Sequence, residues 1–395
     1  MAEWKPEGRR LGKGARAHIQ MGMAHLKAER HDEALRAFQA ALAESPDLAA
    51  GHMGVGAVHL REERYEEAMA SAEKALSLDA NLGRARRVLG EAHLALGNQE
   101  RAVEEFEKAL ALDPSLTAIH LRLGMLRSQG GDYERADSHL QRALESGVSP
   151  GRARMLLAQN AIRRGERDAA IDQLNEVISE NPDSWAAHFQ LGRTLQALKR
   201  HDEAVAALSR AAQLKPEQSA VFSLCAKSHM ALGAFGEAEK YLLQAIKLGA
   251  RAFASKLRLA KCYLEQGKLE LAIGLMEGLT QERPKLGVAH KLLADAYTAK
   301  ERYAEAVRAY SAALNASSKV VEQNPQLREI AQSDLGEREK ARALQRTFAR
   351  ISKASGKEPG DEAPGADGKG ELKGELKGEL GGKGRRLGFG ARRGR

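Results

Sequence analysis

The chain has 395 residues, a formal net charge of +9 and only 4% aromatic residues, so its core must be built chiefly from Ala, Leu and Met. No apolar run is long enough to span a membrane, and no apolar segment follows Met1, so the sequence predicts neither a transmembrane helix nor a secretory signal. Two cysteines, Cys225 and Cys262, argue against a disulfide or zinc framework and favour a reducing, cytoplasmic location.

Residues 1–14 are predicted to form a basic N-terminal arm. The arm contains the start of RRLGKGAR (9–16), which recurs with one change as RRLGFGAR (385–392). Two interpretations stay open. The echo follows from a composition rich in Arg, Gly, Leu and Ala, or both ends contact one kind of anionic surface, such as nucleic acid, acidic lipid head groups or an acidic protein.

From residue 15 onward the sequence repeats every 34 residues. Alanine recurs at this step, at Ala34, Ala68, Ala102, Ala136, Ala170, Ala204, Ala238, Ala272 and Ala306. Twelve residues before each lies a small residue, namely Gly22, Gly56, Gly90, Gly124, Ala158, Gly192, Ala226, Ala260 and Ala294. Small side chains at a fixed phase let two helices approach closely.

Each 34-residue unit is predicted to be a helix, a short turn and a second helix. Apolar residues follow helical spacing, as in Leu35, Phe38 and Leu42. Proline closes five units at one phase, at Pro46, Pro114, Pro182, Pro216 and Pro284, and cannot continue a helix. A single hairpin cannot bury its apolar faces alone, so neighbouring hairpins must stack.

The pattern resembles the tetratricopeptide repeat family, whose signature has a small residue at position 8, Ala at positions 20 and 27, and Pro at position 32. Placing position 8 on Gly22 predicts nine units over residues 15–320. The resemblance implies an all-α, right-handed superhelical α-solenoid that binds partners in its concave groove. The sequence departs from the family in its scarce aromatic residues, and the family's Trp at position 4 is absent.

The histidines match the repeat better than they match a metal site. Of the twelve, all except His139 fall at positions 4, 11 or 17, where the family carries aromatic residues. A packing role is therefore expected, with no metal and no cofactor. The motif HDEA (31–34 and 201–204) looks hydrolytic but opens a second helix, where acids favour the N-terminus. No catalytic residue is identified, and the chain is predicted not to be an enzyme.

A partner-binding surface is predicted on the first helices of units six to eight. In the family, positions 2, 5, 9 and 12 of the first helix commonly face the groove. Position 9 carries Arg193, Lys227 and Lys261 in three successive units, and Trp185 and Phe189 precede Arg193 on one helical face. Such a site suits acidic or extended peptide segments. In the alternative interpretation, the two rings pack between units and the cations are merely solvated.

The C-terminal part of the sequence differs from the repeats. Residues 321–353 are predicted to form capping helices, the second of them over 337–353. Residues 354–395 are predicted to be a disordered Gly/Glu/Leu/Lys linker, because glycine at every fourth place disfavours a helix. The basic tip offers a contact for nucleic acid or an acidic membrane through Arg385, Arg386, Arg392, Arg393 and Arg395.

The sequence therefore predicts a non-catalytic scaffold that binds partner proteins and helps to assemble a multiprotein complex. The alternatives are a protein that associates with an anionic surface through its tail, and a helper subunit of an enzyme. The Ala/Arg/Gly-rich composition is typical of a bacterial source. The identity of the partner and the oligomeric state are not predicted.

Overall fold

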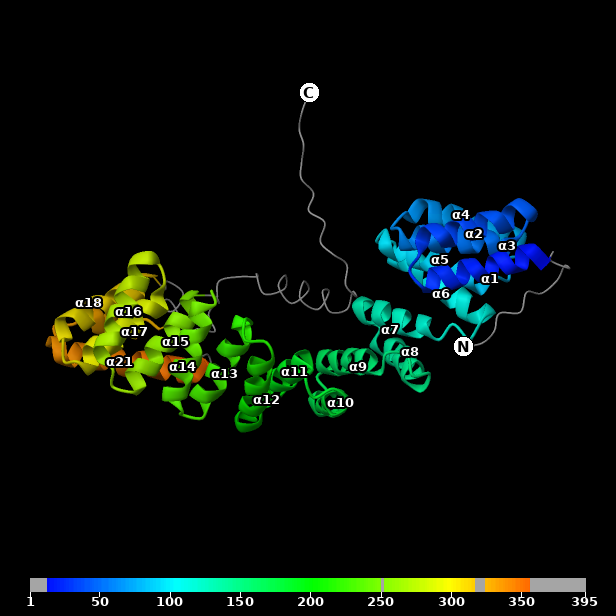
Figure 1. The fold of residues 1–395 in the computed structure, drawn as a ribbon. Coiled ribbons are helices and arrows are strands. Elements are labelled where there is room, and N and C mark those ends of the chain that lie inside the picture. Colours follow the sequence, from blue (N-terminus) through cyan, green and yellow to red (C-terminus); the bar gives the residue numbers. More distant parts are fainter. Residues whose placement is uncertain (1–12, 250–251, 317–323, 356–395) are drawn as a thin grey trace, which may run out of the picture. The chain divides into compact units, whose positions relative to one another are not determined.

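The computed structural model describes residues 13–249, 252–316 and 324–355. These residues form twenty α-helices and no strand, so the predicted all-α solenoid is confirmed, while the number of repeats stays a prediction (Figure 1). The chain divides into two compact units between Gln173 and Leu174, within α10 (Arg167–Glu180). The N-terminal arm and the tail tip lie outside the described residues.

The first unit contains nine helices before α10, and each contacts its neighbours in chain order. They are α1 (Lys13–Lys27), α2 (His31–Glu44), α3 (Ala49–Arg61), α4 (Tyr65–Leu78), α5 (Gly83–Ala95), α6 (Gln99–Leu112), α7 (Ala118–Gly130), α8 (Tyr133–Glu145) and α9 (Pro150–Arg164). The odd-numbered helices correspond to the predicted first helices, and the even-numbered helices correspond to the predicted second helices.

The second unit continues the same alternation and ends in two further helices. Its helices after α10 are α11 (Trp185–Ala197), α12 (His201–Leu214), α13 (Ser219–Ala231), α14 (Phe235–Lys247), α15 (Ala252–Glu265), α16 (Leu269–Glu282), α17 (Gly287–Ala299), α18 (Tyr303–Ala316), α20 (Gln326–Gln332) and α21 (Glu337–Ser355). Helices α20 and α21 lie in the segments where the sequence predicts capping helices.

A contact between a small and a large side chain holds each hairpin together. The glycine at position 8 faces the large residue at position 24 so closely that a Cβ atom would lie 2.6 Å from the Phe38 ring at Gly22 and 2.4 Å from Leu208 at Gly192. These distances are far inside van der Waals contact, so only a glycine fits beside these large side chains without a shift. The predicted reason for the small residues is thereby confirmed.

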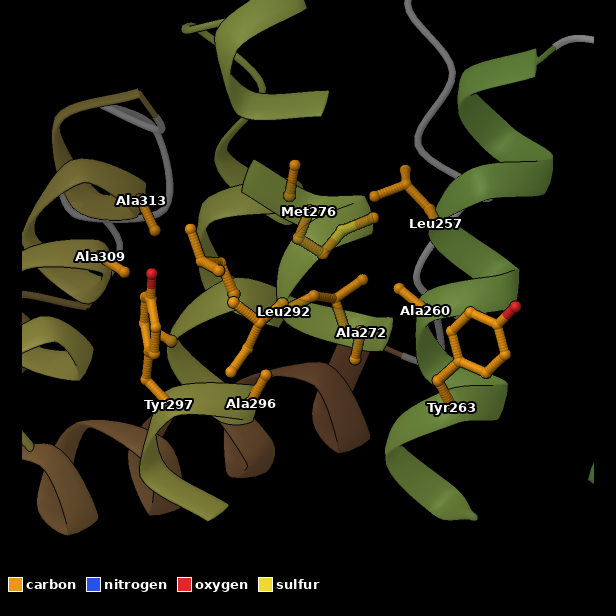
Figure 2. Close-up of a cluster of buried hydrophobic side chains, with 14 of the residues drawn as sticks. Leu257, Ala260, Tyr263, Ala272, Met276, Leu292, Ala296, Tyr297, Ala309 and Ala313 are labelled. Atoms are coloured by element: carbon orange, nitrogen blue, oxygen red, sulfur yellow. The ribbon is translucent and has the colours of Figure 1, made fainter. Parts of the chain in front are cut away.

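The core consists of alanine and leucine with few aromatic residues, as the composition requires. All nine alanines of the 34-residue series have no exposed surface. Figure 2 shows one such cluster, in which Leu257 and Ala260 of α15 meet Met276 of α16 and Leu292 of α17. At the end of the array, Tyr310 of α18 is fully buried and stacks on Phe348 of α21 at a ring-centroid distance of 5.7 Å.

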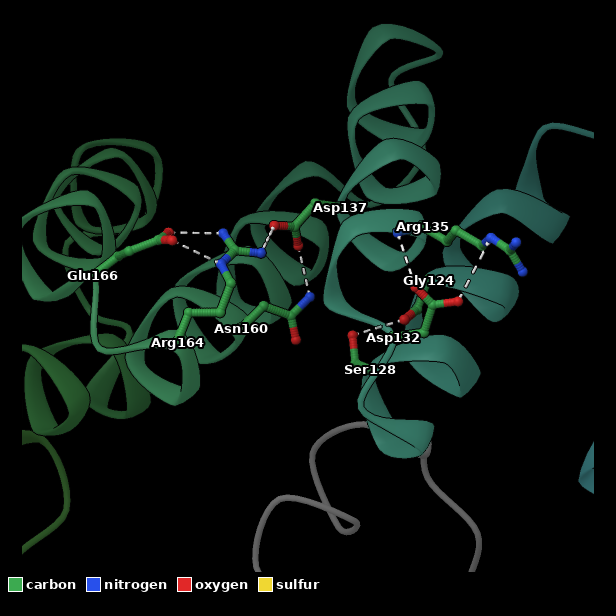
Figure 3. Close-up of polar contacts among 8 residues, drawn as sticks. All are labelled: Gly124, Ser128, Asp132, Arg135, Asp137, Asn160, Arg164 and Glu166. Atoms are coloured by element: carbon green, nitrogen blue, oxygen red, sulfur yellow. Dashed lines mark hydrogen bonds and ion pairs between the residues drawn. The ribbon is translucent and has the colours of Figure 1, made fainter.

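A polar network joins α8 to α9 where the core is interrupted by charged side chains (Figure 3). Asn160, which is 1% exposed, donates from Nδ2 to Oδ1 of Asp137 at 2.7 Å. Arg164 donates to the second oxygen of Asp137 at 2.5 Å and also binds Glu166, and these carboxylates raise the pKa of its guanidinium. Every buried polar atom of Asp137 thus has a charged or amide donor, which fixes the register of the two helices.

Histidines at position 4 link each hairpin to the preceding turn. In three units the ring donates Nε2–H to the proline carbonyl that closes the unit before, at 2.9 to 3.0 Å, in the pairs His52–Pro46, His188–Pro182 and His290–Pro284. A carbonyl oxygen only accepts hydrogen bonds, so the hydrogen lies on Nε2 in each case. These rings act as polar fasteners, in line with the predicted packing role.

His139, the one histidine outside the family's aromatic positions, pairs with His120. The two Nδ1 atoms lie 3.0 Å apart and the ring centroids 5.3 Å apart. Burial is the main reason why the pKa of both imidazoles is lowered, and Arg142 lowers both further. The field at His139 also includes Arg127, which lowers its pKa, and Glu107, which raises it.

The turn inside each hairpin has a left-handed residue at position 15. Glycine occupies this position at Gly97, Gly131, Gly165, Gly233 and Gly267, but Glu29, Glu63, Lys199 and Glu301 adopt φ values of 57° to 61°. A side chain with a Cβ atom is strained in this conformation by about 1–2 kcal/mol. Four hairpins therefore contain a strained turn.

The strained turns predict a stabilising substitution. Glu63→Gly is expected to raise the free energy of unfolding by about 1 kcal/mol, because glycine adopts a positive φ without the Cβ clash. The control is Glu104→Gly, at an exposed position inside α6, which should instead lower it by about 1 kcal/mol. Urea denaturation followed by circular dichroism measures both, and a loss of stability in both variants would contradict the assignment of strain.

The His120–His139 pair predicts a loss of stability in acid. The pKa of each ring is lower in the folded chain than in the unfolded chain, so its contribution is complete above the unfolded pKa and is lost as the pH falls through the folded pKa. Urea denaturation at pH 7.5 and pH 5.5 should therefore show a larger decrease in unfolding free energy for the native chain than for His139→Gln. Equal decreases would refute the pairing as the source.

Candidate partner-binding surface

The predicted aromatic residues lie together on α11, but their exposure differs. The rings of Trp185 and Phe189 are 5.8 Å apart between centroids. Phe189 is only 7% exposed and belongs to a buried cluster with Leu208, Val221 and Cys225. Phe189 therefore supports the surface from below, as the packing interpretation expects, and leaves little of its ring for a partner.

Trp185 takes part in a contact that recurs in another hairpin. Nζ of Lys215 lies 4.2 Å from the centre of the Trp185 ring, and Cζ of Arg283 lies 4.6 Å from the centre of the Phe253 ring. In both cases the ring is at position 1 and the cation at position 31 of the same unit. A cation–π contact at a constant register has a structural role within the hairpin. The half-buried Trp185 therefore lies at the edge of the candidate surface.

Arg193 is the most distinctive residue of the predicted site. Its guanidinium carbon lies 5.7 Å from the centre of the Phe189 ring, and the side chain is half-buried. Burial lowers the pKa of this guanidinium, and no carboxylate of the described chain forms an ion pair with it. A partly desolvated cation without an anion is costly in a folded chain, so it is a candidate for an external carboxylate.

Lys227 and Lys261 repeat the position of Arg193 on the next two first helices. They lie on α13 and α15, and both are half-buried. Each also takes part in an interaction within the chain, so neither lysine is without a partner. Their shared register places the three cations on equivalent faces of successive first helices, as predicted.

The structure offers no conventional catalytic or metal chemistry in its described part. No group of three or more His, Cys, Asp or Glu side chains in this part is arranged to hold a metal ion. Burial raises the pKa of both cysteine thiols, Cys225 and Cys262, to about 12, so they are protonated and poorly nucleophilic at neutral pH. No helix among the described residues has the length and apolar character needed to cross a membrane.

A second group of cations, on the first helices of the first unit, was not predicted. It includes Arg84 and Arg87 of α5, Arg122 of α7 and Arg152 of α9. The sequence analysis compared residues at position 9 alone, whereas these arginines lie at positions 2, 5 and 6 of their units. Comparing all groove-facing positions across units two to five is the signal that finds them. The predicted tail arginines lie outside the described residues.

Solved structures similar to this chain are repeat proteins of low sequence identity. One is a tetratricopeptide repeat protein from Parabacteroides merdae, with 20% identity, a TM-score of 0.42, and coverage of 64% of this chain and 100% of that chain. Another is the C-terminal part of a TPR repeat-containing protein from Cytophaga hutchinsonii, with 15% identity, a TM-score of 0.49, and coverage of 68% and 96%. A third, YrrB, is described as a TPR protein with an unusual peptide-binding site, with 19% identity, a TM-score of 0.30, and coverage of 53% and 91%.

A comparison with curated protein sequences gives no match. Four family models described as tetratricopeptide repeat do match, and together they cover more than half of the chain. The matched residues are 161–228 for one model, 19–83 and 226–286 for a second, 83–116 for a third and 289–322 for a fourth. The chain belongs to the tetratricopeptide repeat family, which supports a general role in protein–protein interaction.

Proposed function

We propose that this protein is a non-catalytic scaffold that captures an extended, acidic segment of a partner protein on α11, α13 and α15 and helps to assemble a multiprotein complex. The observation that carries the proposal is Arg193, a half-buried guanidinium that lies against Phe189 and forms no ion pair with a described carboxylate. A carboxylate from a partner would compensate its desolvation.

The register of the three cations favours an extended ligand. Arg193, Lys227 and Lys261 lie one unit apart, so a ligand that reaches all three must cross successive first helices. An extended chain spans about 3.3 Å per residue, and packed helices lie about 8–10 Å apart, so acids three residues apart would match the spacing. An acidic segment of regular spacing is therefore the preferred ligand.

The proposed place of action is a reducing compartment such as the cytoplasm. Both cysteines are free and fully buried, and the chain requires no disulfide to close its hairpins. A contact between the basic tail tip and an anionic surface stays a separate prediction, supported by the six positive charges among the last fifteen residues.

Neutralising the three cations should weaken partner capture. The variant Arg193→Gln/Lys227→Gln/Lys261→Gln retains similar side-chain length, and each lost charged contact is expected to reduce affinity by about tenfold. Capture from lysate of the source cell, with bound proteins identified by mass, compares this variant with the native chain. The readout is each protein that the native chain enriches.

A matched control removes the same charge elsewhere in the second unit. Lys247, Lys285 and Arg308 are exposed and lie outside the first helices, so Lys247→Gln/Lys285→Gln/Arg308→Gln should retain the partners. Equal retention by both triple variants, each with a native circular dichroism spectrum, would rule out the proposed surface. Loss of partners only on removal of residues 354–395 would assign the interaction to the tail instead.

A further inference from the structure

We propose that the first unit holds a second binding site, independent of the Arg193 surface, in which five arginines recognise a carboxylate-rich peptide segment of a partner protein. The arginine cluster consists of Arg61, Arg84, Arg87, Arg122 and Arg152. These residues come from four successive first helices, α3, α5, α7 and α9. The site does not depend on any residue of α11, α13 or α15.

The arginines of the cluster act on one another. Nε of Arg122 donates to Oε1 of Glu91 at 3.0 Å, which joins α7 to α5. Burial is the main cause that lowers the pKa of Arg87; Glu91 opposes this effect, while Arg61, Arg84 and Arg122 add to it. The pKa of Arg152 is likewise lowered, first by burial and then by Arg122. Positive charge is therefore concentrated and only partly hydrated on this face.

The chain supplies too little negative charge to balance the cluster. Glu91 is the carboxylate that meets it, and this residue already pairs with Arg122. Among the described residues, Arg61, Arg84 and Arg87 form no ion pair with any carboxylate. Four of the five guanidinium groups thus have no bound anion within the described chain, which destabilises the unoccupied face through like-charge repulsion.

Arg152 gives a second, independent sign of a missing ligand. Its Nε atom is buried without a hydrogen-bond partner. Its Nη2 atom donates only to Sδ of Met125, at 3.7 Å, and a thioether is a weak acceptor. A buried guanidinium donor without an acceptor is rare, and a carboxylate that accepts two parallel hydrogen bonds is its best-matched partner.

The surroundings of the cluster favour a peptide over a nucleic acid. The four helices contain no Phe, Tyr or Trp, so they offer no aromatic ring on which bases could stack. They do contain two half-buried methionines, Met125 and Met155, at groove-facing positions beside Arg122 and Arg152. Methionine adapts to apolar side chains, so a segment that alternates carboxylates with apolar residues fits this face.

The length of the segment follows from the spacing of the helices. Four helices give three intervals of about 8–10 Å, and an extended peptide covers about 3.3 Å per residue, so about nine residues cross the cluster. A suitable probe is a fluorescein-labelled nonapeptide that alternates Glu with Leu. A second probe, in which Gln replaces every Glu, tests the need for charge.

The experiment measures fluorescence anisotropy with the full chain carrying Arg193→Gln/Lys227→Gln/Lys261→Gln, so that the first surface does not contribute. This protein should bind the Glu probe at least about tenfold more tightly than the Gln probe. Adding Arg87→Gln/Arg152→Gln should weaken binding of the Glu probe by at least about tenfold. The control Arg101→Gln/Arg167→Gln, at exposed positions of α6 and α10, should leave it unchanged.

Three outcomes would overturn the proposal. The first is equal binding of the Glu and Gln probes, and the second is equal weakening by the cluster variant and its control. The third is stronger binding of a single-stranded oligonucleotide that displaces the Glu probe, which would assign the cluster to nucleic acid. Circular dichroism at the assay temperature confirms that each variant is folded.

The chain's own acidic segment is a competing occupant that the same assay tests. Residues 358–367 read EPGDEAPGAD and carry four carboxylates. Replacing these four acids by their amides in the full chain should leave the affinity for the Glu probe unchanged. An increase of about tenfold or more would identify this segment as the occupant and overturn the assignment to a partner protein.

Discussion

The contact between position 8 and position 24 is the constraint on which the rest of the fold depends. Where Gly22 faces Phe38, or Gly192 faces Leu208, the helices approach so closely that there is no room for a Cβ atom. This approach buries the alanines of the 34-residue series completely and permits a core with few aromatic residues. It also fixes the rotation of each first helix, and therefore which residues face the groove.

The fold could be predicted from the sequence because the period is strict. A step of 34 residues without insertion places the small residues, the buried alanines and the closing prolines at one phase, and local packing repeats with them. The same register explains the histidines, since His52, His188 and His290 make one and the same bond to a preceding proline carbonyl. The left-handed turn at Glu63 has no such signal, because glycine marks this position in only some of the units.

The site was harder to predict, because a helix position does not determine exposure. Position 5 faces the groove in the family, yet Met53 is 2% exposed and Phe189 7% exposed, while Arg87 at the same position is half-buried. The size of the neighbouring side chains decides whether such a residue contributes to the core or to the surface. The pairing of His139 with His120 depends likewise on two helices whose side chains only the structure brings together.

The left-handed turns also distribute stability unevenly along the chain. In a solenoid each hairpin contacts only its neighbours, so strain at one turn is felt locally instead of being shared by the whole domain. The hairpins with Glu29, Glu63, Lys199 and Glu301 at position 15 are therefore the ones that open at lowest cost. Their amide hydrogens would exchange with solvent soonest, so the array behaves as a series of semi-independent foldons with the least stable turns set by side chains.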